Sequence, residues 1–266
     1  MPEFRDTVLV LRHRVYRDHD ALLVAFGREQ GKFSAVARGV RSSRSHLAAG
    51  VQPLTLTEMT VFQGRSTLYT VTSADAVRHY PRIRQTLERT ARAAMLADML
   101  DELWSEHDAA PPAFQLVVEA FSALEEGRPP AAVFLAGFWH LMRQAGFAPD
   151  FSVCSVCGAS MADAQQAGFR TSAGPVCSRC RGPEDTDLST AALSWLRRAG
   201  TLSGERLGTL VGSRSVMEGL ERQARDYLVY HLGRMPRAFR FWEQVSEPIF
   251  RLDVPSVPDV EEGDPS

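Results

Sequence analysis

Hydrophobic and polar residues along the first 80 positions follow the pattern of short β-strands. Five segments alternate between the two kinds of residue or are rich in β-branched residues: 7–11, 20–26, 31–37, 54–62 and 67–72. Glycines between several of these segments indicate tight turns. Five short strands in about 75 residues favour a small barrel such as the five-stranded OB-fold. Another five-stranded β domain, such as an SH3-like barrel, is the alternative.

From Pro81 onward the apolar residues recur every three or four positions, which predicts helices. The first helix extends to about Glu106, and proline-containing breaks separate it from the next two. The remaining helices are expected at 114–124, 132–145, 190–199 and 215–232. We therefore predict an α+β protein in which an N-terminal OB-fold barrel precedes a central and C-terminal helical bundle. A small insert without helical periodicity interrupts this bundle.

These patterns divide the chain into five parts. We expect a barrel at 1–80, the first part of a helical domain at 81–150 and an insert at 151–185. The second part of the helical domain is expected at 186–244 and an acidic tail at 245–266. The residues from Ser246 onward contain four prolines and six acidic residues against Arg251 as the single basic one. Such a segment cannot offset its ordering entropy by burial, so the tail is predicted to be mostly disordered.

Composition and charge narrow the class of protein. The chain has 266 residues, of which 44% are hydrophobic and 23% charged, as in ordinary globular proteins. It contains neither a long uncharged apolar run nor a signal-peptide pattern, so we expect a cytoplasmic protein without a membrane partner. The net charge of −2 hides an asymmetry, because residues 1–80 carry 11 basic and 7 acidic side chains. This local excess of positive charge points to an anionic partner more clearly than the total charge does.

All four cysteines of the chain belong to one motif in the insert: Cys154, Cys157, Cys177 and Cys180. Two C-x-x-C pairs separated by 19 residues have the spacing of a four-cysteine zinc site. Two residues between cysteines let both sulfurs of a turn face the same ion. Disulfides are the alternative, which a cytoplasmic chain disfavours, and a redox pair is another. We predict one structural zinc ion per chain, since four thiolates leave no open position for catalysis.

A second feature is a basic segment between Arg28 and Arg44. It holds five basic residues against one acidic residue, and Phe33 lies among them. Cations on a strand that leaves into a flexible loop suit a phosphate-tracking groove, and an aromatic ring suits base stacking. A solvated charged surface is the alternative. Another basic stretch, 227–240, is either a helix C-terminus whose cations favour the helix dipole or a second candidate for phosphate contacts.

The sequence offers no constellation for catalysis. It has no complete phosphate-binding loop, no dinucleotide-binding fingerprint, no zinc-protease motif and no nucleophile elbow. The polar cluster at 18–20 is better explained as a turn than as a site. We therefore predict a protein that is not an enzyme.

Several strings in a fixed order resemble the RecO family of bacterial recombination mediators. Residues 31–41 look like the strand-and-loop signature of that family, and 47–58 look like its next strand. Residues 147–150 look like its lead into the zinc ribbon, and 232–234 look like the end of its last long helix. The resemblance covers about residues 1–243, and the order of the strings makes it specific.

The resemblance implies a function. Proteins of this family bind single- and double-stranded DNA, anneal complementary strands and, with RecR, help to load RecA onto DNA covered by single-strand binding protein. They contact the C-terminal tail of single-strand binding protein, and they are cytoplasmic and nucleoid-associated. The positions that the resemblance indicates as DNA contacts are Lys32, Arg38, Arg41 and Arg44, with Arg14 and Arg65 as secondary choices.

The competing hypothesis is a zinc-ribbon scaffold that docks proteins and does not bind DNA itself. The salt dependence of binding distinguishes the two hypotheses, because the affinity of a protein for DNA falls steeply as the salt concentration rises. The acidic tail is either an inert solubilising segment or a competitor of DNA for the same arginines.

Overall fold

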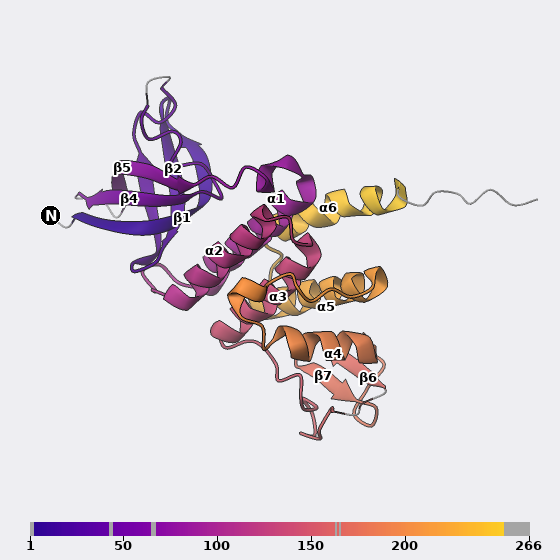
Figure 1. Cartoon of the computed structure of the whole chain (residues 1–266). Coiled ribbons are helices and arrows are strands. Elements are labelled where there is room, and N and C mark those ends of the chain that lie inside the picture. Colours follow the sequence, from indigo (N-terminus) through magenta and orange to yellow (C-terminus); the bar gives the residue numbers. More distant parts are fainter. Residues whose placement is uncertain (1–2, 43–44, 65–67, 163, 165, 253–266) are drawn as a thin grey trace, which may run out of the picture.

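The computed structural model describes residues 3–42, 45–64, 68–162, 164 and 166–252. A β-barrel and a small three-stranded sheet lie at opposite ends of a group of helices (Figure 1). The fold is α+β, as predicted, with the barrel at the N-terminal end of the chain.

The barrel consists of five strands, which are closed in the order β1-β2-β3-β5-β4. Their bounds are β1 Glu3–Tyr16, β2 Asp20–Gly27, β3 Gly31–Ala37, β4 Leu56–Gln63 and β5 Tyr69–Arg78. All neighbours are antiparallel except β3 and β5, which run parallel. This closed five-stranded arrangement agrees with the predicted OB-fold. The first strand is longer than expected because its first half pairs with β4 and its second half with β2.

Side chains alternate between the inside and the outside of the barrel. Val8, Val10 and Leu23 belong to the buried barrel interior. Leu9 and Phe26 instead belong to the core of the helical part, so the outer face of β1 and β2 packs against helices. The barrel is thereby fixed to the helical part by apolar contact as well as by the chain connection.

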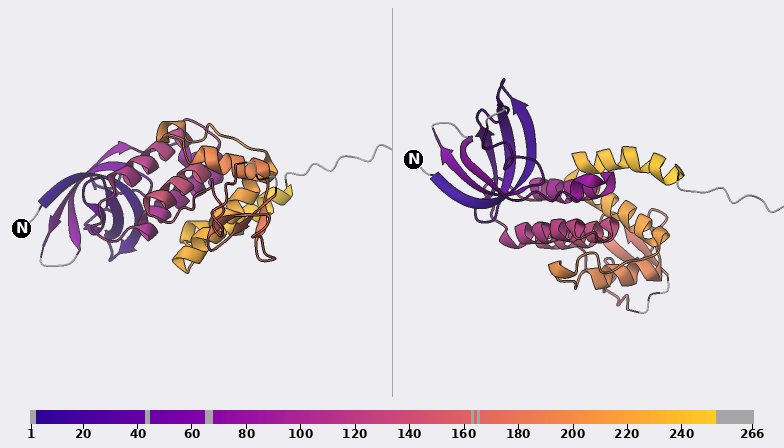
Figure 2. Two further views of the ribbon diagram at one scale, coloured as in Figure 1. Left: turned by 90° about the horizontal axis from the view of Figure 1, so that it is seen from below. Right: turned by 45° about the horizontal axis from the view of Figure 1, so that its top comes forward.

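Within the described part of the chain, six α-helices follow the barrel. They are α1 Leu87–Leu103, α2 Pro111–Glu125, α3 Pro130–Gln144, α4 Thr190–Ala199, α5 Arg214–Leu232 and α6 Arg237–Leu252, with short 3-10 turns at Ile83–Gln85 and Gly204–Arg206. Prolines that we interpreted as breaks are also the first residues of α2 and α3. Proline suits that position because its missing N–H would have no partner in the helix. Figure 2 shows α6 at the edge of the helical part, beside α1.

The insert forms a sheet in the order β7-β6-β8. Its strands are β6 Ala167–Arg170, β7 Gly174–Cys177 and β8 Thr186–Leu188. Trp139 of α3 contacts the rings of Phe151, Phe169 and Tyr227, and Cys154 belongs to the same apolar cluster. One hydrophobic core therefore runs from the outer face of the barrel through the helices into the insert.

The end of the chain differs from the sequence-based expectation. The stretch 227–240 is not a single helix C-terminus, because α5 ends at Leu232, with Gly233 as its C-cap at φ +67, and Arg237 begins α6. Helix α6 extends to Leu252, so helix occupies the start of the segment that we expected to be a tail. Phe239 and Trp242 provide the reason, since both rings are buried against the other helices. Residues 253–266 lie outside the described residues.

Candidate nucleic-acid interface and metal centre

A groove of about 440 Å³ lies on the barrel. Two arginines and three aromatic residues contribute to its lining: Tyr16, Arg17, Arg38, Phe62 and Tyr69. The guanidinium of Arg17 lies over the Tyr16 ring at 5.2 Å, and neither arginine forms an ion pair with any residue that the structure describes. Cations and partly exposed rings in one groove are the two elements that single-stranded nucleic acid requires of a binding surface.

The loop after β3 is held in place by the turn between β1 and β2. Arg38 follows the last residue of the strand, and the N–H of Gly39 donates to Oδ1 of Asp20 at 2.9 Å. Nη1 of Arg41 donates to the carbonyl of Asp18 at 3.0 Å. The polar residues at 18–20 therefore form a turn that positions the basic loop, as their composition indicated.

The structure separates the residues that were predicted as DNA contacts. Arg38 and Arg41 are exposed on the loop after β3, and Arg14 is exposed on β1 in a different groove. Arg44 and Arg65 lie outside the described residues.

Lys32 has a different environment from the arginines of the loop. Its side chain is 15% exposed, its ammonium lies 3.4 Å from Oδ1 of Asp101, and it donates to the carbonyl of the same residue. Burial lowers the pKa of Lys32. Arg12 of β1 pairs with the same carboxylate. Lys32 thus joins the barrel to the end of α1, and it does not lie in the groove with Arg38.

Phe33 does not provide the stacking surface that we expected from it. The ring is fully buried inside the barrel, where it contacts Phe4 and Tyr69 edge to face. The alternation of β3 explains this position, because Phe33 shares its face with the apolar residues Ala35 and Ala37. Tyr69 takes the role instead, since it lines the groove from the neighbouring strand.

Sequence analysis missed Arg17 and the three aromatic residues of the groove. Tyr16 and Arg17 lie beyond the strand that the pattern predicts at 7–11, whereas β1 extends to Tyr16. The β1–β2 ladder, which continues to Tyr16 and Asp20, brings them beside the loop after β3. Only the alternation along 31–37, which places Phe33 on the same face as Ala35 and Ala37, could have indicated from the sequence that Phe33 is buried.

The four cysteines meet at the insert. Their sulfurs all lie within 4.8 Å of one another, and Sγ of Cys157 is 3.8 Å from Sγ of Cys177. A tetrahedron of Zn–S bonds has sulfur–sulfur edges of about 3.8 Å, so the thiols have the spacing that a zinc ion needs. Gly158, with φ +71, closes the first turn by donating its N–H to the carbonyl of Cys154 at 2.9 Å.

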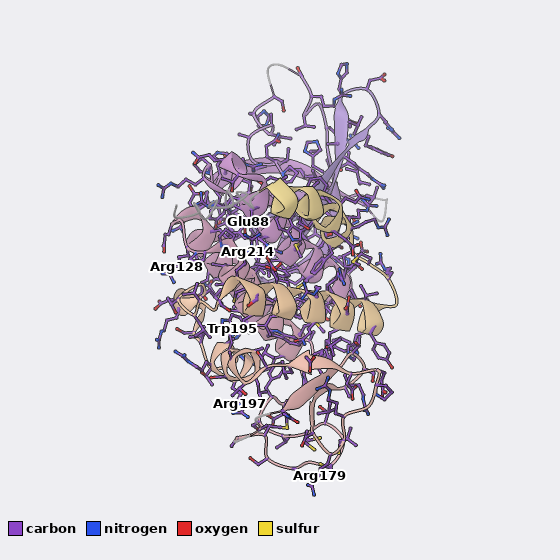
Figure 3. All side chains as sticks on the ribbon, turned by 90° about the vertical axis from the view of Figure 1, so that its right-hand side faces the viewer. Glu88, Arg128, Arg179, Trp195, Arg197 and Arg214 are labelled. Carbon is purple, nitrogen blue, oxygen red and sulfur yellow. The ribbon has the colours of Figure 1, made fainter. Side chains whose placement is uncertain are left out.

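The electrostatics of the thiols also fit a cation. Burial raises the pKa of Cys154, but the backbone N–H groups of Cys177, Cys157 and Val156 together lower it to about 6. The neighbouring thiols Cys157 and Cys177 raise the pKa of Cys180 to about 12. Four close thiolates repel one another, and a bound cation removes that repulsion. Arg179, between the last two cysteines, lies at the end of the molecule away from the barrel (Figure 3).

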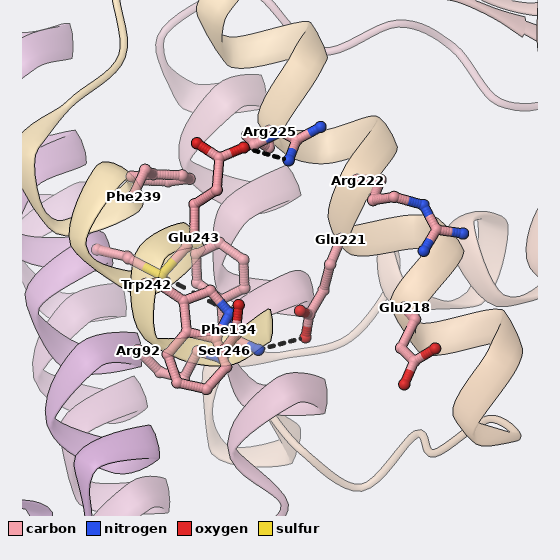
Figure 4. A pocket seen from close by; sticks show the side chains of 11 residues that line it. Arg92, Phe134, Glu218, Glu221, Arg222, Arg225, Phe239, Trp242, Glu243 and Ser246 are labelled. Atoms are coloured by element: carbon pink, nitrogen blue, oxygen red, sulfur yellow. Dashed lines mark hydrogen bonds and ion pairs between the residues drawn. The ribbon is translucent and has the colours of Figure 1, made fainter. Parts of the chain in front are cut away.

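A further cavity of about 420 Å³ lies among α1, α3, α5 and α6 (Figure 4). Arg92 of α1 is 1% exposed there, and its guanidinium donates to Oε1 of Glu221 at 2.6 Å. Its Cζ lies 5.1 Å from the ring centre of Phe134 and 4.3 Å from that of Trp242. Burial raises the pKa of Glu221. This cluster ties α6 to the other helices.

Models of two regions of one known family match the chain. The model described as Recombination protein O N terminal matches residues 1–80, and that described as Recombination protein O C terminal matches residues 84–238. The chain belongs to the RecO family. The boundary between the two matches falls between β5 and α1, and the C-terminal match ends within the first turn of α6.

Individual RecO proteins are similar to this chain over most of its length. The DNA repair protein RecO of Anaeromyxobacter sp. (strain K) is 30% identical over 252 residues, which cover 92% of this chain and 98% of the relative. That of Rubrobacter xylanophilus is 30% identical over 233 residues, covering 87% and 93%. That of Alkaliphilus metalliredigens is 27% identical over 230 residues, covering 85% and 92%. The resemblance to the RecO family that the sequence motifs indicated is therefore confirmed.

Among the helices of the part that the structure describes, none combines the length and the apolar character that a membrane span requires.

Proposed function

We propose that the chain is a recombination mediator in DNA repair, which binds single- and double-stranded DNA and anneals complementary strands. With RecR it would help to load RecA onto DNA covered by single-strand binding protein, whose C-terminal tail it would contact. The names of its relatives, DNA repair protein RecO, support the role in repair. We place its action in the cytoplasm at the nucleoid.

The observation that carries the proposal is the groove of the barrel. Arg17 and Arg38 provide phosphate contacts, while Tyr16, Phe62 and Tyr69 provide faces on which bases stack. Stacking does not depend on the base, so the groove accepts any sequence. An OB-fold binds oligonucleotides on this kind of surface.

The residues predicted as DNA contacts differ in how well their surroundings suit a phosphate contact. Arg38 and Arg41 lie on one loop beside the groove, and Arg14 extends the positive surface along β1. Arg44 and Arg65 remain proposed contacts from the family resemblance. Lys32 is the least suited, because Asp101 already holds its ammonium group.

We propose further that one zinc ion per chain holds the insert and takes no part in chemistry. The four cysteine sulfurs would fill its coordination shell and leave no position for water. No bond-breaking reaction is proposed for this protein.

Fluorescence anisotropy with a labelled single-stranded oligonucleotide across a salt series tests the proposal. If about four cations contact phosphates, the logarithm of the binding constant falls with the logarithm of the salt concentration with a slope of about −3. The double variant Arg38→Ala/Arg41→Ala should bind all sequences more weakly and have a shallower slope. The control Arg206→Ala/Arg222→Ala removes the same charge from exposed positions of the helical part.

Equal affinity of the two double variants would refute the assignment of the barrel loop. Affinity for single-stranded DNA that does not change with salt would refute electrostatic binding. Failure of the chain to bind the oligonucleotide even at low salt would favour the protein-docking scaffold instead.

A further inference from the structure

We propose that the path of single-stranded nucleic acid continues from the barrel into a second groove, where α6 contributes Arg237 and Phe241. The inference rests on the proposed function and extends it, because it makes the helical part a direct contributor to binding. The groove has a volume of about 510 Å³ and lies between β1 and β2 on one side and α1 and α6 on the other. Its lining includes Arg12, Arg14, Leu22, Asp98, Arg237 and Phe241.

The strand register connects the two grooves. Arg14 of β1 lies opposite Leu22 of β2, Leu22 opposite Val36 of β3, and Val36 opposite Thr70 of β5. Arg14 and Leu22 line the second groove, whereas Val36 and Thr70 line the first. Register partners point to the same side of a sheet, and three strand spacings amount to about 14 Å. A single row of side chains across the barrel therefore joins one groove to the other.

The charges of the second groove suit a phosphate chain. The side chains of Arg14 and Arg237 form no hydrogen bond or ion pair with the residues that the structure describes, whereas Arg12 pairs with Asp101. The carboxylate that lines the groove is Asp98, which accepts a hydrogen bond from the N–H of Ala238 at 2.8 Å. Burial raises its pKa, while Arg12 and Arg237 lower it. Because Asp101 neutralises Arg12, the charge of the groove is set by Arg14 and Arg237 against the carboxylate of Asp98, which leaves an excess of positive charge.

Phe241 supplies an aromatic face in this groove. It is 45% exposed, although it lies between two buried residues of the same helix, Phe239 and Trp242. Trp242 stacks on the buried guanidinium of Arg92, so α6 is fixed with Phe241 facing out. An exposed ring beside unpaired arginines matches the stacking and cation pattern of the barrel groove.

The neighbouring arginines of α6 and its connection do not share this position. Arg234 pairs with Glu102, and Arg240 donates to the carbonyl of Met235 at 3.4 Å. Neither contributes to the lining of the groove. Arg240 therefore provides a matched control, because it is an exposed arginine on the same helix as Arg237.

The test measures the affinity of the full chain for oligothymidylates of about 4 and about 16 nucleotides, which bracket the site sizes of OB-folds. Arg237→Ala should weaken binding of the long oligonucleotide and make its salt slope shallower by about 0.7, with little effect on the short one. Phe241→Ala should weaken binding of the long one about fivefold or more. Ultraviolet crosslinking of the long oligonucleotide should label the peptide that contains Phe241.

The outcomes separate this inference from the proposed function. If Arg237→Ala and Phe241→Ala bind the long oligonucleotide like Arg240→Ala, while Arg38→Ala/Arg41→Ala still weakens binding, the second groove is refuted and the barrel site stands. If the barrel variant also binds normally, both proposals fail. Weakening by Arg240→Ala equal to that by Arg237→Ala indicates a general charge effect and likewise overturns the inference.

Discussion

The buried pair of Arg92 and Glu221 allows a quantitative test of how α6 is held in place. The perturbation is Arg92→Met, which keeps an unbranched apolar chain of similar length and removes the charge. In the native protein the guanidinium donates to Oε1 of Glu221 at 2.6 Å and lies between the rings of Phe134 and Trp242. The variant leaves the carboxylate of Glu221, whose side chain is 15% exposed, without its cation.

Removing one partner of a buried ion pair costs about 3–5 kcal/mol, because the other charge remains desolvated. Loss of the two cation–π contacts adds to this cost, and the new methionine offsets part of it by apolar burial. We therefore expect the free energy of unfolding to fall by about 3 kcal/mol or more. Glu221→Gln should also destabilise the protein, since it leaves Arg92 without a counter-charge. In the double variant neither charge remains, so its cost should be clearly smaller than the sum of the two single costs.

Urea unfolding followed by circular dichroism and by tryptophan fluorescence gives the three free energies, and coincidence of the two probes checks two-state behaviour. The exposed pair of Arg214 and Glu218 on α5 is the control, for which Glu218→Gln should change stability by less than about 1 kcal/mol. A loss below 1 kcal/mol in Arg92→Met, or additive costs in the double variant, would contradict the interpretation of this pair as the anchor of α6.

Two further predictions concern the other end of the molecule. Cys154→Ser should lower the zinc content, measured by elemental analysis, below the expected value of about one ion per chain. It should also lower the melting temperature of the helical part, measured by thermal unfolding, because the insert shares the core of that part. A freshly purified native protein without stoichiometric zinc would contradict the metal assignment. Nδ1 of His140 accepts a hydrogen bond from Arg143, and burial lowers the pKa of His140 below its ordinary value of about 6.5. The neutral ring therefore contributes fully to stability above about pH 6.5. This contribution is lost as the pH falls through the folded-state pKa. Unfolding at several pH values should therefore show a weaker acid sensitivity in His140→Gln, and an unchanged pH profile would refute the assignment.

Much of the fold followed from local patterns. The strands at 20–26 and 31–37 and the helix at 190–199 were predicted close to their actual bounds, because alternation and helical spacing are properties of short segments. Helix α6 was missed for the converse reason. Its first residues belong to the basic stretch 227–240, which we interpreted as a helix C-terminus or a second candidate for phosphate contacts. The partners of its buried rings are distant in sequence, since Phe239 contacts Phe134 and Trp242 contacts Arg92, both more than 100 residues earlier in the chain.

The sequence by itself determined the barrel, the helical part and the cluster of four cysteines. The spacing of the cysteines was sufficient to predict that they cluster, since two residues between thiols let both thiols face one ion. The tertiary structure decided which cations share a surface. Lys32 and Arg38 are six residues apart, yet one is held by Asp101 at the junction with α1 and the other lines the barrel groove. Arg237 and Arg14 are more than 200 residues apart and line the same groove. A charge pattern along the chain does not encode such distances, because the packing of the barrel on the helices sets the burial and the neighbours of each side chain.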